Sequence, residues 1–414
     1  MSTTDWGHSH TVPRQSDAPV FWLVAAGVSF NFFLSIANAH VLSVSGTHVQ
    51  IVQLAITGAA LLLTFLRGGP TVPFAFPALV VAFIVLSGIS AFAAGGAGDI
   101  KTTYDVVLLC TFIALGSTVG RMPLRVLNWI LAFSAVVAVF EYFMPTAYTQ
   151  LVDPLDYFAN TRAWVAEALG DTFTEGAGLG ISGIRGSGES WLGLSVGGHR
   201  VGGIFLEPLS QGYFAAVLAI FYCYHFQDDF RRRTLACLVC LVLALISDTR
   251  LAVLLIGFFY IATPVARRLP AQIAYLVPVV GLALGMSVFA VFNDNTSEFV
   301  FRLSLTFQTL LHSQLYNVLF GGVDLTYAAD SGIVTILSRA GLLGLMVFFV
   351  IASGLASMHQ RISTVLILVS VYLFATALFG AAFLSIKTAA LLGLLIGATG
   401  TGAFAPGFSA ERRR

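Results

Sequence analysis

Long apolar stretches alternate with short polar breaks along most of the chain. The stretches recur at about 20 residues, the length that a helix needs to cross the hydrocarbon core of a bilayer. They lack the short apolar–polar alternation of a membrane β-barrel. The pattern predicts about twelve transmembrane helices, at residues 19–38, 49–66, 73–93, 104–119, 125–144, 208–225, 234–247, 250–266, 272–292, 332–357, 362–382 and 384–404. We therefore expect an all-α polytopic membrane protein in which residues 1–414 form a single integral membrane domain.

Two longer polar segments, 145–207 and 293–331, interrupt this alternation. In the first, an amphipathic helix is predicted to begin after Asp153 and to end at Gly170. In the second, the spacing of apolar residues predicts an amphipathic helix at roughly 297–320. Both helices are expected to lie on the membrane surface or on the outer face of the protein.

Composition supports the membrane assignment, since 57% of the residues are hydrophobic, 10% are charged and the mean hydropathy is +0.88. One soluble core of this length cannot bury so much apolar surface. The arginines lie in short turns rather than on one basic face, so no nucleic acid is expected as a partner. The four cysteines lie inside apolar stretches and are interpreted as packing residues rather than as a redox or metal pair.

The distribution of positive charge predicts the orientation of the chain. With a cytoplasmic N-terminus, the cytoplasmic loops contain the arginine clusters at 231–233, 267–268 and 412–414. Lysine and arginine are enriched in cytoplasmic loops of membrane proteins. The pattern therefore places both termini in the cytoplasm and makes 145–207 and 293–331 extracytoplasmic loops.

An arginine and a glutamate flank a glycine pair just before the helix predicted at 208–225. Arg200 and Glu207 enclose Gly202 and Gly203, where the backbone can approach a ligand closely. Charge at a membrane edge is expensive to desolvate, which indicates a functional site in a chain so short of charge. The alternative is an Arg–Glu ion pair that only ties the loop to the helix.

Three further arginines are expected on the same side. Arg250 ends the tight turn that begins at Ser247, Arg302 lies in the second outer loop, and Arg339 lies inside an apolar helix. A guanidinium offers two parallel N–H groups to phosphate oxygens, so Arg200, Arg250, Arg302 and Arg339 are predicted to bind a diphosphate. An unspecific contact with lipid phosphate is the alternative for Arg250.

Asp330 stands at the start of the helix predicted at 332–357, where free backbone N–H groups keep a carboxylate ionised. Cations that hold a diphosphate leaving group, with a carboxylate that accepts the proton of an attacking hydroxyl, are suited to sugar transfer. Asp330 and Glu207 are thus candidate catalytic residues, with a simple helix cap as the alternative for Asp330. The sequence contains neither a metal-ligand cluster nor a glycine-rich nucleotide loop, so no metal or other cofactor is expected.

At these residues the chain resembles the O-antigen polymerase and O-antigen ligase superfamily, in its exopolysaccharide polymerase branch. The features that carry the resemblance are Arg200-x-x-Gly203-x-Phe205-x-Glu207-Pro208, Ser247-x-x-Arg250, the late outer loop with Arg302, and Gly321-Gly322 followed by Asp330-Ser331-Gly332 and Gly341-x-x-Gly344. The part of the chain before Arg200 is similar to the superfamily only in its hydropathy.

The resemblance implies a metal-independent glycosyltransferase with a GT-C-like fold, at the outer face of the bacterial inner membrane. Such enzymes move a growing glycan from undecaprenyl diphosphate onto a lipid-linked repeat unit or, in ligases, onto a lipid core. Ligases usually have a His-Asn pair where this chain has Asp330-Ser331, which favours a polymerase. The implied partners are an undecaprenyl-diphosphate-linked oligosaccharide and the lipid bilayer, with a flippase and a chain-length regulator as candidate protein partners.

A transporter or lipid-linked glycan flippase is the alternative from a different class. A flippase is expected to carry charged side chains along a passage through the membrane. Most of the predicted spans lack ionisable residues, with Glu141 and Arg339 as the main exceptions, and the charge gathers on one side. This distribution favours sugar transfer over transport.

Overall fold

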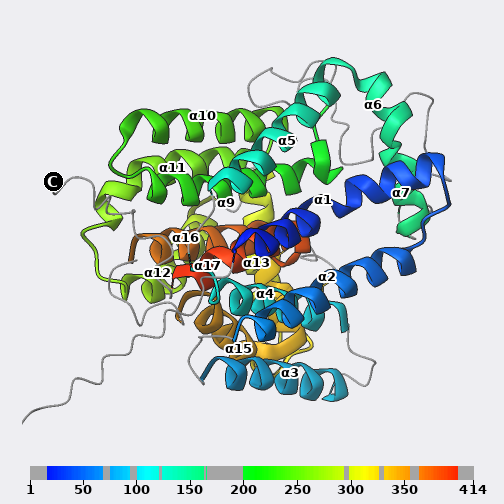
Figure 1. Ribbon diagram of the computed structural model, residues 1–414. Coiled ribbons are helices and arrows are strands. Elements are labelled where there is room, and N and C mark those ends of the chain that lie inside the picture. Colours follow the sequence, from blue (N-terminus) through cyan, green and yellow to red (C-terminus); the bar gives the residue numbers. More distant parts are fainter. Residues whose placement is uncertain are drawn as a thin grey trace, which may run out of the picture.

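A computed structural model describes residues 16–68, 75–93, 100–120, 124–162, 165, 199–292, 298–325, 331–354 and 363–399 of the chain. Regular secondary structure in these residues is helical (Figure 1). A helix lies in each of the twelve segments for which a span is predicted. These helices are α1 (Ala18–His40), α2 (Gly46–Leu66), α3 (Ala75–Ala93), α4 (Ile100–Gly116), α5 (Leu124–Phe143), α9 (Pro208–His225), α10 (Phe230–Ile246), α11 (Arg250–Ala266), α12 (Ile273–Phe292), α15 (Gly332–Gly354), α16 (Ser363–Phe379) and α17 (Ile386–Thr399).

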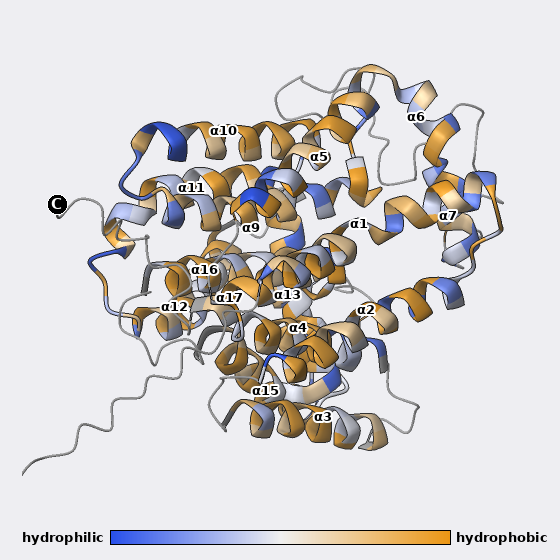
Figure 2. Ribbon diagram, viewed as in Figure 1, coloured by the Kyte–Doolittle hydropathy of each residue, from blue (hydrophilic) through white to orange (hydrophobic). Residues whose placement is uncertain are grey.

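Five of these helices, α1, α2, α5, α12 and α15, are long and apolar enough to cross a membrane. Shorter apolar helices are found within α3, α11, α16 and α17. Apolar residues dominate the ribbon in Figure 2, whereas hydrophilic residues concentrate at helix ends and turns. The all-helical fold and the apolar helices are those of a membrane protein.

Helix α9 forms the centre of the bundle. Sixteen of its 18 residues are buried, as expected for a helix that is apolar on all sides. It packs against α10, α11, α16 and α17. By contrast, α2 leaves large apolar side chains such as Leu54 and Phe65 more than half exposed, which suits a helix that faces lipid.

Glycines allow α4 and α17 to pack closely along each other. A Cβ atom at Gly393 would come within 2.8 Å of the Leu109 carbonyl oxygen, and one at Gly397 would collide with the Ile113 carbonyl. Spacing of small residues by four positions is a common device for close helix packing in membranes. Because Leu109 is level with Gly393 and Ile113 with Gly397, the two helices run parallel and in register.

The described part of segment 145–207 contains one short helix before Asp153 and one at the start of the helix predicted from Asp153 to Gly170. Helix α6 (Pro145–Val152) is followed by α7 (Pro154–Thr161). The Asp153 carboxylate accepts a hydrogen bond from the Asp156 backbone N–H, so the predicted start is confirmed. The predicted end at Gly170 was wrong for α7, because Arg162 is extended and stops the helix at Thr161. Gly170 itself lies outside the described residues.

In the described part of segment 293–331, two helices are found instead of the one predicted at roughly 297–320. Helix α13 (Glu298–His312) and helix α14 (Leu315–Phe320) are separated by an extended Gln314. The Ser313 hydroxyl donates to the Thr309 carbonyl at 2.6 Å, a local bond that competes with the regular helical pattern. The prediction of one continuous helix was therefore wrong.

Candidate functional site

A cavity of about 620 Å³ opens where several helix ends meet. All of these ends are predicted from the sequence to lie on the same side of the membrane. The helices α1, α2, α4, α7, α15 and α17 contribute to its wall together with Glu207. Its volume falls within the range of ordinary ligand sites. The described residues that line it are Asn31, Gly46, Val49, Gln50, Gln53, Lys101, Thr102, Asp105, Tyr157, Phe158, Thr161, Arg162, Glu207, Leu325, Thr335, Ala381, Leu384, Ser385, Ile386 and Lys387.

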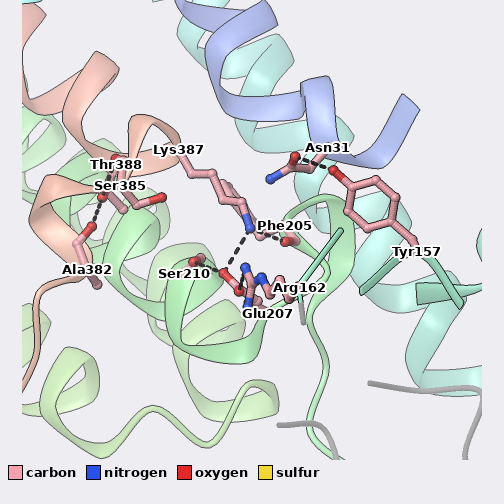
Figure 3. A network of polar contacts seen from close by, with 10 residues as sticks. All are labelled: Asn31, Tyr157, Arg162, Phe205, Glu207, Ser210, Ala382, Ser385, Lys387 and Thr388. Carbon is pink, nitrogen blue, oxygen red and sulfur yellow. Dashed lines mark hydrogen bonds and ion pairs between the residues drawn. The ribbon is translucent and has the colours of Figure 1, made fainter. Parts of the chain in front are cut away.

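Glu207 lies between two cations in the wall of this cavity (Figure 3). Its Oε2 accepts a hydrogen bond from Lys387 Nζ at 2.9 Å and from the Ser210 hydroxyl at 3.0 Å. Its Oε1 accepts from an Arg162 terminal N–H group. The Lys387 ammonium also donates to the Phe205 carbonyl at 2.8 Å. Three segments far apart in the sequence thus meet at one carboxylate.

The two cations decide the protonation state of Glu207. Burial alone would raise the pKa of this carboxyl, but the Lys387 ammonium and the Arg162 guanidinium outweigh burial and hold the pKa below its ordinary value. Both carboxylate oxygens are engaged. A carboxylate of this kind is a weak base, so the geometry favours a role for Glu207 in holding the cations over one in proton abstraction.

A second carboxylate, Glu141 on α5, fixes the backbone that leads to Glu207. It accepts hydrogen bonds from the Gly202 N–H at 3.1 Å and the Gly203 N–H at 2.5 Å. His199 Nε2 lies 2.9 Å from its Oε1. Gly203 begins a short 3₁₀ turn, η3 (Gly203–Phe205), with φ +53°, where a side chain would also meet Gln211. The carboxylate of Glu141 therefore shapes the turn that presents the Phe205 carbonyl to Lys387.

Arg200 and Arg250 come together at the turn between α10 and α11. Arg200 is buried, and it donates from Nε to the Ser247 carbonyl at 3.1 Å and from a terminal nitrogen to the Asp248 carbonyl at 3.4 Å. Arg250 Nε lies 4.0 Å from the Asp248 carboxylate. The Thr249 hydroxyl donates to the Pro208 carbonyl at 3.1 Å, which ties this turn to the segment next to Glu207. Arg200 therefore stabilises the α10–α11 turn, a structural role that its sequence motif did not predict.

Of the other predicted site residues, two are absent from the described lining of the cavity and one lies outside the described residues. Arg302 is half-buried on α13, which packs against α12, α15 and α16. Arg339 is half-buried on α15, two residues before Gly341 interrupts that helix with φ +66°. Within the part of the chain that the structure describes, neither arginine lines the cavity at Glu207. Asp330 lies outside the described residues.

Sequence reasoning missed Arg162, Lys387, Lys101 and Asp105 as site residues. Lys387 carries a usable signal, because it is the one charged residue of the sequence between 363 and 399. An ionisable side chain within an apolar segment is a functional-site hypothesis by default. Arg162 follows a short amphipathic helix and gives no such signal. Its place beside Glu207 depends on how α7 packs against α1 and α2.

The described lining carries three cations and two carboxylates, so its formal charge is positive. Amide and hydroxyl side chains, including Asn31, Gln50, Gln53 and Thr335, supply hydrogen-bonding groups beside them. A site of this kind suits an anionic ligand that also carries hydroxyl groups. Among the described residues, no three His, Cys, Asp or Glu side chains are grouped so that they could hold a metal ion. Comparison of the chain with protein-family models, curated proteins and solved structures gave no match.

Proposed function

We propose that this protein is a glycosyltransferase that polymerises lipid-linked polysaccharide repeat units at the outer face of a bacterial inner membrane. The observation that carries the proposal is the positively charged cavity at one end of an apolar helical bundle. A diphosphate-linked sugar matches both the cations and the hydroxyl-binding groups of this cavity. The proposal includes a multi-pass, GT-C-like arrangement of twelve spans with both termini in the cytoplasm.

In this proposal, Arg162 and Lys387 bind the diphosphate of the undecaprenyl carrier. Glu207 keeps both cations in place and prevents them from repelling each other. Arg200 and Arg250 support the segment that carries Glu207 and stand near the lipid headgroups. Binding of the leaving diphosphate by fixed cations lowers the barrier to glycosyl transfer, because negative charge develops there in the transition state. The chemistry that we propose needs no metal ion.

The decisive experiment uses the purified full-length protein in lipid nanodiscs. A lipid-linked repeat unit, extracted from the source bacterium after deletion of the gene, is added, and the length of the products is analysed. A ladder of multiples of the repeat unit supports a polymerase. Transfer of one glycan to a lipid core would instead identify a ligase.

Transport is tested in sealed vesicles that contain the same protein. Movement of the lipid-linked oligosaccharide across the bilayer without any new glycosidic bond would replace our proposal by a flippase. Partner proteins such as a chain-length regulator are expected to change the number of repeat units in the products. They are not expected to be required for polymerisation itself.

A further inference from the structure

Asp105 is the second carboxylate that the structure brings into the cavity. It lies on α4, where Lys101, Thr102 and Asp105 all line the cavity wall. Lys101 and Asp105 are four residues apart and share one face of the helix. Of the carboxylates that line the cavity in the described part of the chain, the other is Glu207. Glu207 is clamped between Lys387 and Arg162.

The helix register sets the level of Asp105 relative to Lys387. Gly393 of α17 is level with Leu109 of α4, and the helices run parallel. Four residues earlier on each helix, Asp105 is level with position 389, two residues from Lys387. Two residues correspond to a rise of about 3 Å along a helix axis. Asp105 and the diphosphate-binding cation therefore stand at nearly the same height in the same cavity.

We propose that Asp105 is the catalytic carboxylate that accepts the proton of the attacking hydroxyl group. The inference rests on the proposed glycosyl transfer and adds the identity of its base. The hydroxyl proton passes to an Asp105 carboxylate oxygen while the hydroxyl oxygen forms a bond to the anomeric carbon. The bond between that carbon and the diphosphate oxygen breaks, and its electron pair leaves with the undecaprenyl diphosphate. The proton then passes from Asp105 to solvent, so no oxidant or reductant is needed.

The neighbours of Asp105 are suited to hold the acceptor sugar. Gln50 and Gln53, three residues apart on α2, line the same cavity and offer amide groups to sugar hydroxyls. The acceptor hydroxyl would thus be held between α2 and α4, and the diphosphate at Lys387 and Arg162. This division assigns the sugar-binding part of the cavity to α2 and α4, which pack against each other.

The test compares Asp105→Asn and Asp105→Glu with a matched control, Asp228→Asn. Asp228 is exposed and lies in the loop between α9 and α10, where its carboxylate pairs with Arg267 at the end of α11. It is not among the residues that line the cavity. Turnover is measured with the extracted lipid-linked repeat unit, and binding is measured separately with undecaprenyl diphosphate alone. Asp105→Asn should lower kcat by about 10²- to 10⁴-fold with unchanged undecaprenyl diphosphate binding. It should also remove the acidic limb of the pH profile of kcat, and Asp105→Glu should recover part of the rate.

Two results would overturn the inference. If Asp105→Asn protein keeps the wild-type kcat, Asp105 is not the base. Loss of turnover by Asp330→Asn protein in the same assay would then assign this role to Asp330. Loss of undecaprenyl diphosphate binding in both Asp105 variants, with turnover at saturating substrate intact, would assign Asp105 to binding. A wild-type protein that neither binds undecaprenyl diphosphate nor extends the glycan would refute the proposed function itself.

Discussion

Lys387 and Glu207 are 180 residues apart in the sequence, yet Lys387 Nζ lies 2.9 Å from Glu207 Oε2. The Lys387 side chain is 3% exposed and that of Glu207 is 21% exposed. A buried ammonium needs a charged partner and further hydrogen bonds, which Glu207 and the Phe205 carbonyl provide. This contact joins the start of α17 to the start of α9 at the wall of the cavity.

Replacing Lys387 by Met should weaken binding of undecaprenyl diphosphate. The loss of one charge-assisted hydrogen bond corresponds to roughly a 10- to 100-fold increase in Kd. Lys387→Arg should retain part of the affinity, because the positive charge remains. Arg232→Met is the control, because Arg232 is 73% exposed. It lies near the start of α10, at the other end of that helix from the α10–α11 turn. Equal affinity of wild-type and Lys387→Met protein would contradict a role of this lysine in binding the diphosphate.

Stability should depend on pH through Glu207. Because the pKa of Glu207 is lower in the folded protein than its ordinary value of 4.5, its ionised form stabilises the folded state at neutral pH. This contribution is complete above pH 4.5 and is lost progressively as the pH falls below 4.5 towards the folded-state pKa. Thermal unfolding in detergent between about pH 3 and 7 measures the effect. Glu207→Gln protein should show a smaller decrease in Tm over this range than wild type.

Glu141→Gln should destabilise the protein, because the amide removes the negative charge and one of the two oxygens that accept hydrogen bonds from the Gly202 and Gly203 N–H groups. The expected loss is about 1–3 kcal/mol, the usual result when a buried donor loses its partner. Denaturant-induced unfolding in detergent micelles gives this value. His199→Ala, which leaves the glycine N–H contacts intact, should cost less. Equal losses for the two variants would argue against the glycine contacts as the main function of Glu141.

Gly397→Val should separate α17 from α4. A Cβ atom at this position collides with the Ile113 carbonyl and comes within 2.8 Å of the Ser117 nitrogen. Gly257→Val on α11 is the matched control, since nothing lies within 4 Å of its added Cβ. We expect a lower Tm and weaker undecaprenyl diphosphate binding for Gly397→Val alone, because Lys387 moves with α17. Similar Tm values for both variants would show that close α4–α17 packing is dispensable.

Single cysteines can test the orientation in the membrane. All four native cysteines are buried, so the background reaction with a membrane-impermeant maleimide should be low. Leu42→Cys follows α1 at an exposed position, and Arg231→Cys lies at the exposed start of α10. In intact spheroplasts, Leu42→Cys should react and Arg231→Cys should react only after lysis. The reverse pattern would place the cavity on the cytoplasmic side and reject the proposed outer-face reaction.

The hydropathy of the chain was enough to locate the helices, because burial of an apolar helix in lipid or protein depends mainly on its own composition. It also placed Glu207 directly before a predicted helix and close in sequence to a charged residue, Arg200. The breaks at Arg162 and Gln314 were missed because local hydrogen bonds and backbone conformation, rather than apolar spacing, end those helices.

Which polar groups meet was decided only by the packing of the helices. The glycines of α17 let it approach α4, and this register brings Lys387 to the level of Asp105. The α10–α11 turn draws Arg200 into backbone contacts, so this arginine supports the site in place of lining it. No sequence spacing encodes such contacts, because each depends on the mutual positions of helices that are far apart in the chain. The sequence by itself determined a helical membrane protein with charge at one end; the tertiary structure selected Glu207, Lys387 and Arg162 from that charge.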